Sequence, residues 1–475
     1  MNADVRAETD LRAVFGDEHP ATVRVLVPVG MLGGGFPEET VARASELGAH
    51  VIAVDGGSTD SGPHYLGTAI AKTSRTAVAR DLRLILRAGR AAGIPVIVGS
   101  CGTSGTDAGV DWVFGIASEI AEAEGLELTV SRIYSEQSIH IVTKFLEAGA
   151  VNALPPAEPL TAEIVAGCSH IVGVLGHEPI VDALASGANL VLTGRATDTA
   201  LIAAIPLALG MPAGPVWHGS KISECGGLCT TNPLSGGVLV SFDASGFTVE
   251  PLASDAVCTP RSVAAHMMYE NADPFRMREP AGTLDTSAAT YRQLDERSVR
   301  VEGSRFERAE QYTIKLEGAA PAGFQTMILV GLRDPQVLAR LDEWCGGVLA
   351  YLRQNIHRQF GLEPKDFDLQ LRRYGHDGVL AKGEPQRSDP PREVGLVFIA
   401  TAADQQTATQ LAKFANPVLL HAPLPGETAL PSYAFFGSPA ETERGQLHEF
   451  VLNHSVNVHS PAQLFRTVRT ELVPA

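Results

Sequence analysis

The chain alternates short apolar runs with helical patterns from residue 22 to about residue 218, and this alternation limits the folds open to it. Val23–Val27 and Val51–Val54 predict strands, and the residues between them predict a helix that begins near Pro37. The same order recurs, with further strands near 95–98, 127–134, 170–175 and 189–193 and helices near 111–124, 136–148, 179–187 and 197–210. Such alternation is typical of an α/β fold whose mostly parallel sheet is flanked by helices on both faces.

The pattern changes after about residue 236. Val238–Phe242 and Phe247–Val249 predict a hairpin with a glycine turn, and strand pairs interrupted by single helices follow it. This order favours an α+β C-terminal domain, of which a ferredoxin-like sandwich is one form. Because 475 residues with 45% hydrophobic content exceed a usual single core, we expect two domains. The expected parts are an extension over 1–21, an α/β domain with its site loops at strand ends over 22–285, and the α+β domain over 286–475.

Charge and composition exclude several classes of protein. A net charge of -17 disfavours nucleic acid and anionic membrane as partners, so an anionic substrate needs a local positive site. The N-terminal residues do not form a secretory signal, and Ala200–Trp217, although uncharged, contains three prolines that favour an interior helix ending near residue 210 over a membrane span. Six sparse cysteines favour a reduced, cytoplasmic setting over a disulfide framework.

Gly30–Gly35 follows the first predicted strand and contains four glycines. The segment fails as a dinucleotide fingerprint because Glu38 stands where the third glycine is needed. It also fails as a phosphate loop, because Phe36 and Pro37 replace the lysine and the hydroxyl residue. The sequence therefore contains no NAD or ATP motif. Two interpretations stay open: a tight turn, or an anion site made by the backbone amides of Gly33, Gly34 and Gly35.

Five predicted strand ends carry glycine, and all but the first add a chemically capable side chain. Ligands of open parallel sheets bind beyond the carboxyl ends of the strands, so these segments predict a common site. The proton-transfer candidates among them are Asp55, His177, Glu178 and Asp198. The candidates for holding the substrate or an anion are Ser58, Asp60, Cys101 and Arg195.

Each of these residues also has a structural interpretation. The aspartates can cap turns, and Cys101 can be a small core thiol instead of a nucleophile. His177 and Glu178 suit acid–base work or a hydrogen-bonded cap, but not a metalloprotease motif, because Val181 replaces the second histidine. Arg195 can bind a carboxylate of the substrate or pair with an internal aspartate.

The segment from His218 to Cys229 adds Glu224 and Cys225 as catalytic candidates. Its two cysteines are three residues apart and lack a second pair, which falls short of a structural zinc motif. We therefore assign no metal ligands from the sequence. The cofactor stays unknown, and a requirement for a divalent metal stays open.

Several longer strings resemble the acyclic terpene utilisation family, the AtuA-like proteins. They are Thr193–Leu201, Glu224–Gly227, Ala265–Pro274, Lys315–Ala320, Gly331–Pro335 and Arg373–Gly375. The resemblance runs from about residue 22 to 458. It implies a bacterial cytoplasmic protein that takes part in catabolism of branched carboxylic acids or their coenzyme A esters. It also implies a separate small partner subunit, since some relatives have a small additional domain. In addition, we expect the chain to form a homo-oligomer.

These observations lead to one functional hypothesis and two alternatives. The chain is expected to be a lyase or hydratase that performs acid–base chemistry on a small branched carboxylate or acyl-coenzyme A. The first alternative is a hydrolase of a related ester, lactone or amide, with Cys101 or Cys225 as nucleophile. The second is a non-catalytic subunit that binds acyl-coenzyme A in a larger complex, with Gly30–Gly35 holding a phosphate.

Overall fold

A computed structural model describes Leu11, Phe15 and residues 20–385, 389–428 and 433–474. The chain divides into two compact units, with unit 1 formed by residues 1–320 and 450–475 and unit 2 by residues 321–449. The expected N-terminal extension over 1–21 lies largely outside the described residues. Among the described helices, none has both the length and the apolar character needed to cross a membrane.

Unit 1 is built on a ten-stranded sheet whose centre is parallel. Its five parallel strands lie in the order β1 (Val23–Val27), β2 (Val51–Asp55), β3 (Val96–Gly99), β7 (Leu190–Thr193) and β4 (Leu128–Tyr134). Every residue of β2, β3 and β7 is buried, as a strand covered on both faces requires. The α/β alternation predicted for this part of the chain is confirmed.

Antiparallel strands extend this sheet on both sides, so it is less parallel than expected. Beside β1 lie β8 (Val238–Phe242), β9 (Gly246–Pro251), β13 (Val299–Glu302) and β12 (Thr290–Gln293), and beside β4 lies β20 (Arg466–Leu472). Of the nine neighbouring pairs, four are parallel and five antiparallel. The short turn between β8 and β9 joins adjacent strands directly, which permits only antiparallel pairing.

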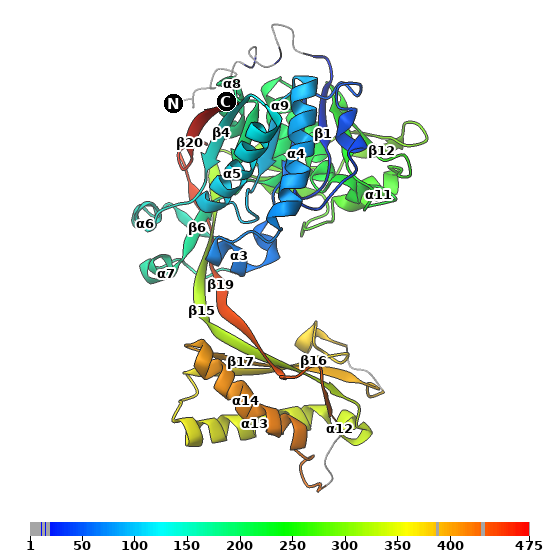
Figure 1. Cartoon of the computed structure of the whole chain (residues 1–475). Helices are drawn as coiled ribbons and strands as arrows, with labels where there is room; N and C mark the ends of the chain where they lie inside the picture. Colours follow the sequence, from blue (N-terminus) through cyan, green and yellow to red (C-terminus); the bar gives the residue numbers. More distant parts are fainter. Residues whose placement is uncertain (1–10, 12–14, 16–19, 386–388, 429–432, 475) are drawn as a thin grey trace. The chain divides into compact units, whose positions relative to one another are not determined.

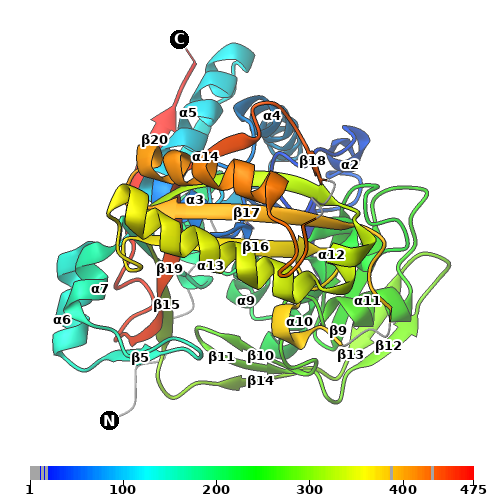
Figure 2. The same ribbon diagram turned by 90° about the horizontal axis from the view of Figure 1, so that it is seen from below.

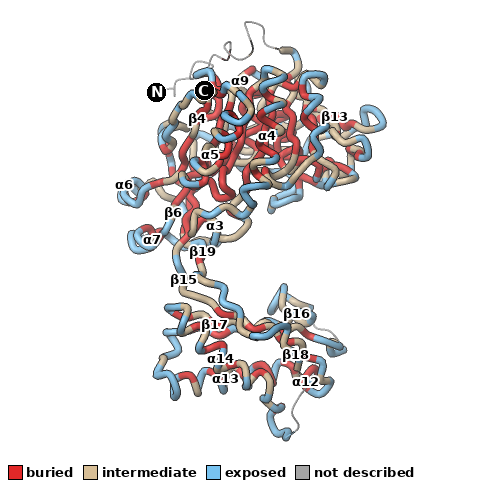
Figure 3. The backbone as a smooth tube through the Cα atoms, in the orientation of Figure 1, coloured by how far each residue is buried: buried red, intermediate tan, exposed pale blue. Residues whose placement is uncertain are grey.

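Helices cover both faces of the parallel strands (Figure 1). Alternate residues of β2 point to opposite faces: Ala53 belongs to the core on the side of α9 (Asp198–Ala208), whereas Ile52 belongs to the core on the side of α4 (Arg75–Ala92). Figure 3 shows buried backbone concentrated between these layers. The helices of unit 1 are α2 (Glu39–Ala42), α3 (Pro63–Thr68), α4 (Arg75–Ala92), α5 (Asp107–Glu124), α6 (Ile139–Glu147), α7 (Ala162–Gly167), α8 (Glu178–Ala185), α9 (Asp198–Ala208), α10 (Ala213–Ser223) and α11 (Pro260–His266).

The strand expected near 170–175 forms, as β6 (His170–Gly173), but not in the parallel sheet. It pairs antiparallel with β15 (Thr313–Leu332), because β7 already occupies the place between β3 and β4. The helix expected to end near residue 210 is α9, which ends at Ala208 and is followed by α10. The other strands of unit 1 are β5 (Val151–Ala153), β10 (Arg276–Glu279), β11 (Gly282–Asp285) and β14 (Arg305–Arg308).

Unit 2 packs two long helices on one face of an antiparallel sheet (Figure 2). The helices are α13 (Leu341–Phe360), preceded by the short α12 (Pro335–Ala339), and α14 (Gln405–His421). Alternate residues of β17 are buried, so one face of the sheet forms the core of this unit. The strands are β16 (Phe367–Tyr374), β17 (Val394–Ala402), β18 (Tyr433–Phe435) and the parts of β15 and β19 (Glu441–Asn457) that fall in the unit.

The expected domain boundary between residues 285 and 286 lies inside unit 1. The strands just after it, β12 and β13, pair with β9 of the large sheet, and β14 pairs with β11. The chain enters unit 2 within β15 and leaves it within β19, and it then forms β20 in unit 1.

Candidate functional site

Backbone hydrogen bonds join the segments that follow β1, β2, β3 and β7. The amide of Leu32 donates to Asp55 O at 2.7 Å, that of Gly56 to Gly99 O at 2.7 Å, and that of Ser100 to Gly194 O at 3.1 Å. Gly105 has a φ of +67°, and a Cβ atom there would lie 2.1 Å from the Arg195 amide nitrogen. Only glycine permits this approach of two backbones. Four of the five predicted strand ends therefore meet at one edge of the sheet.

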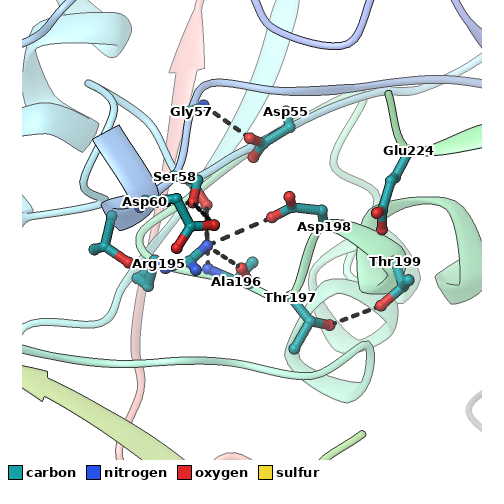
Figure 4. Close-up of polar contacts among 12 residues, drawn as sticks. Asp55, Gly57, Ser58, Asp60, Arg195, Ala196, Thr197, Asp198, Thr199 and Glu224 are labelled. Atoms are coloured by element: carbon teal, nitrogen blue, oxygen red, sulfur yellow. Dashed lines mark hydrogen bonds and ion pairs between the residues drawn. The ribbon is translucent and has the colours of Figure 1, made fainter. Parts of the chain in front are cut away.

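Arg195 is the buried cation of this cluster (Figure 4). Its Nε donates to Glu317 Oε2 at 3.0 Å, and its Nη1 donates to Ala196 O at 2.8 Å and to Ser100 Oγ at 3.3 Å. Nη1 also lies 3.4 Å from Asp198 Oδ1. The internal pairing that the sequence left open is therefore formed, with Glu317 as the nearer partner.

Glu317 is a residue of the site that the sequence did not indicate. It lies on β15, accepts a hydrogen bond from Thr59 Oγ1 at 2.9 Å and pairs with Lys315 Nζ at 2.7 Å. Burial alone would raise its pKa, but Arg195 and Lys315 lower the pKa of Glu317 to about 2. The available sequence signal is the spacing of Lys315 and Glu317, which places both side chains on one face of a strand.

Asp55 and Asp198 are two further carboxylates at strand ends, and Figure 4 shows both beside Arg195. Burial and mutual repulsion raise the pKa of Asp55 well above its ordinary value, against the attraction of Arg195. Burial also raises the pKa of Asp198. The amide of Gly57 donates to Asp55 Oδ2 at 2.9 Å, whereas Oδ1 is buried without a hydrogen-bond partner.

Ser58 and Asp60 lie in the turn that follows Asp55. Ser58 Oγ accepts a hydrogen bond from the amide of Asp60 at 3.0 Å and donates to Asp60 Oδ2 at 2.9 Å. This exchange caps the short 3₁₀ helix from Thr59 to Ser61. Figure 4 places both side chains near Arg195, so the turn borders the charged cluster.

Glu224 and Glu279 complete the buried acidic set. Glu224 lies directly after α10 and pairs with Lys221 Nζ at 2.5 Å, yet burial raises its pKa to about 8. Glu279 ends β10 and was not among the sequence candidates. Burial raises the pKa of Glu279 to about 7, although Thr199 Oγ1 donates a hydrogen bond to its Oε1 at 2.6 Å. The Oε2 atom of Glu279 is buried without a partner.

His177 and Glu178 lie at the start of α8. The strand-end segment before them is joined to the Arg195 segment through a parallel bridge between Leu175 and Ala196. His177 Nδ1 lies 3.4 Å from Glu178 Oε2 without the geometry of a hydrogen bond, and Tyr312 Oη donates to Glu178 Oε2 at 2.8 Å. Burial lowers the pKa of His177, which favours the neutral form of the ring.

The environments of Cys101 and Cys225 disfavour the ionised, thiolate form of each side chain. Cys101 is fully buried, and its Sγ donates to Val98 O at 3.6 Å. Burial and the neighbouring Asp55 raise the pKa of Cys101, and burial with Glu224 and Asp198 raises that of Cys225. Cys225 instead belongs to a group of metal-ligand types, since donor atoms of Glu224, Cys225 and His266 lie within 4.8 Å of one another.

The glycine-rich turn binds a side chain of the protein itself. The amides of Gly33 and Gly35 donate to Asp81 Oδ2 at 2.8 and 3.0 Å, and Asp81 is fully buried. The turn does approach the site at its first residue, because a Cβ atom on Gly30 would lie 2.8 Å from Cys225 O. Gly33–Gly35 are thus held by an internal carboxylate, and the segment has the geometry of the tight turn.

A protein-family model matches most of the chain. The model described as acyclic terpene utilisation family protein AtuA matches residues 72–209 and 242–456. The chain belongs to the acyclic terpene utilisation family. The family match covers Arg195, Asp198, Glu279 and Glu317, whereas Asp55 lies before the matched ranges and Glu224 and Cys225 lie between them. Comparisons with curated proteins and with solved structures find no match.

The contacts of Asp81 predict how the glycine turn depends on it. Asp81→Ala leaves the amides of Gly33 and Gly35 without their acceptor, and we expect a loss of about 3 kcal/mol in the free energy of unfolding, measured by urea denaturation. Arg90→Ala, on the exposed side of α4, is the control and is expected to cost less than about 1 kcal/mol. Equal losses in the two variants would contradict this account of the turn.

The raised pKa of Glu279 predicts a pH dependence of stability. Between its ordinary pKa of 4.5 and the folded value of about 7, the folded protein holds a proton that the unfolded chain has released, so stability falls as pH rises through this window. Glu279→Gln removes this loss, and its stability relative to the wild type should rise by up to about 3 kcal/mol between about pH 5 and about pH 8.

Urea denaturation at the two pH values measures this difference. Glu122→Gln, on the exposed side of α5, is the control, and it should change the free energy of unfolding by less than about 0.5 kcal/mol. A relative stability of Glu279→Gln that is the same at both pH values would show that Glu279 does not hold a proton in the folded state.

Proposed function

We propose that this family member is a lyase or hydratase that performs acid–base chemistry on a small branched carboxylate or its coenzyme A thioester. The observation that carries the proposal is the pair of buried carboxyl oxygens, Asp55 Oδ1 and Glu279 Oε2, that have no hydrogen-bond partner. Buried polar atoms are nearly always paired in folded proteins, so unpaired atoms at a strand-end site favour a role in binding a substrate.

The acidic cluster suits reactions in which one proton is removed from a reactant and one proton is added to the product. Hydration of an α,β-unsaturated thioester adds the oxygen of water to the β-carbon and a proton to the α-carbon. Lysis of a β-hydroxy thioester removes the hydroxyl proton, breaks the bond between the α- and β-carbons and returns a proton to the α-carbon. A carboxyl group with a pKa of about 7, such as Glu279, can donate and accept protons near neutral pH.

Arg195 is the group best placed to attract the carboxylate or carbonyl oxygen of a substrate. Its Nε is committed to Glu317, which has a low pKa and stays ionised. Its contact with Asp198, at 3.4 Å, is the longer one. A proton on Asp198, whose pKa is raised, weakens this contact and leaves the guanidinium able to bind an anion.

The two alternatives receive less support from the geometry. A cysteine hydrolase needs a thiolate, and burial raises the pKa of both Cys101 and Cys225. A phosphate site at Gly33 and Gly35 needs free amides, and these two bind Asp81. A cytoplasmic location, a homo-oligomer and a small partner subunit stay predictions.

Turnover of small branched thioesters tests the proposed reaction. The probes are β-methylcrotonyl-coenzyme A for hydration, β-hydroxyisovaleryl-coenzyme A for lysis to acetone and acetyl-coenzyme A, and the two free acids. We expect at least one to be converted, as measured by mass spectrometry of the products. Glu279→Gln and Asp198→Asn should each lower kcat by about 100-fold or more, because each removes a proton-transfer group.

The control is Glu136→Gln, which alters a half-buried carboxylate that pairs with His170 instead of Arg195. Its kcat should stay within about twofold of the wild type. The proposal is wrong if the folded protein converts none of the four compounds, or if both cluster variants keep the wild-type kcat.

A further inference from the structure

Two helices of unit 1 end at the same place and bring three potential metal ligands together. Glu224 and Cys225 directly follow α10, and His266 is the last residue of α11. One donor atom from each residue lies within 4.8 Å of the other two. The ligands of a tetrahedral zinc ion are about 3 to 4 Å apart, so small side-chain rotations bring these atoms to coordinating positions.

The environment of His266 is independent evidence that the group of Glu224, Cys225 and His266 binds a ligand. The residue is 5% exposed, and its Nε2 atom is buried without a hydrogen-bond partner. Its ring stacks on Tyr269, with centroids 5.4 Å apart and planes 13° apart, so the plane of the imidazole is held in position. A buried, oriented and unpaired imidazole beside a thiol and a carboxylate has the form of a ligand whose partner is a metal ion.

The surrounding charges favour a cation. The carboxyl ends of α10 and α11 both carry partial negative charge toward the group. The negative charges of Asp198 and Glu270 act on Cys225, and that of Asp198 also acts on Glu224. Lys221 is the positive group that faces all three proposed ligands. Lys221 donates to Glu224 Oε1, so a metal ion must use the second oxygen of Glu224 or displace the ammonium group.

We propose that Glu224, Cys225 and His266 bind a divalent transition metal ion of the zinc class and leave its fourth position open. One thiolate, one imidazole and one carboxylate suit zinc, whereas magnesium and calcium prefer oxygen ligands alone. Three protein ligands with a free position are typical of zinc sites that bind water or a substrate. This site does not depend on the reaction proposed above, and its test does not use activity.

Titration of metal-free protein with Co²⁺ tests the site, because a cobalt–thiolate bond gives an intense near-ultraviolet charge-transfer band. We expect one equivalent of Co²⁺ to produce the band and Zn²⁺ to abolish it. Cys225→Ser should remove the band, and His266→Gln should weaken Co²⁺ binding at least about tenfold. Lys221→Met should tighten binding, because it removes the competing ammonium group from Glu224.

Cys168→Ser is the control, since it changes a buried thiol elsewhere in unit 1 whose Sγ donates to Ile164 O. This variant should keep the band and the affinity. Absence of a charge-transfer band in the wild type overturns the proposal. So does a band that survives in Cys225→Ser, or Co²⁺ affinity that is unchanged in both His266→Gln and Lys221→Met.

Discussion

The ion pair between Arg195 and Glu317 is the interaction on which the site depends. A guanidinium cannot lose its charge at any ordinary pH, so its burial at the end of β7 requires a carboxylate that is also permanently ionised. Glu317 meets this condition because Arg195 and Lys315 lower its pKa to about 2. The pair joins segments 122 residues apart and so fixes β15 beside the strand-end loops.

This pairing also divides the acidic residues of the site into two kinds. Glu317 is ionised and positions Arg195, whereas burial raises the pKa of Asp55, Asp198, Glu224 and Glu279. Among the second kind, Glu224 and Glu279 have pKa values of about 8 and about 7, which lie near neutral pH. Carboxyl groups with opposite pKa shifts at one edge of a sheet are a common arrangement of acid–base sites, since environment separates groups of the same chemistry into different roles.

Local patterns in the sequence were sufficient to predict the parallel strands and the loops that follow them. The strands β2 and β7 can be recognised from their apolar runs alone. Asp55 and Arg195 can be recognised as site candidates because they stand at the ends of these runs. Glu317, the partner of Arg195, could not be predicted in this way, and neither could Glu279 and His266. These three residues reach the site from distant strands and helices, and no local pattern connects them to it. Asp81 likewise binds the glycine turn from 46 to 48 residues away. For the same reason β6 was assigned to the wrong sheet, because a short apolar run does not specify its partner strand.

The balance of charge links proton transfer to metal binding. The edge of the sheet gathers five carboxyl groups, Asp55, Asp198, Glu224, Glu279 and Glu317, with three basic groups, Arg195, Lys221 and Lys315. If all were ionised, the carboxylates would outnumber these basic groups in a largely buried region, which is costly. Protons on the carboxyl groups and a divalent cation bound together with the Cys225 thiolate each reduce this excess of negative charge. A metal ion beside Glu224 would therefore release protons from the neighbouring carboxyl groups, so the loading of the proposed metal site and the protonation of the acid–base groups are coupled through the same field.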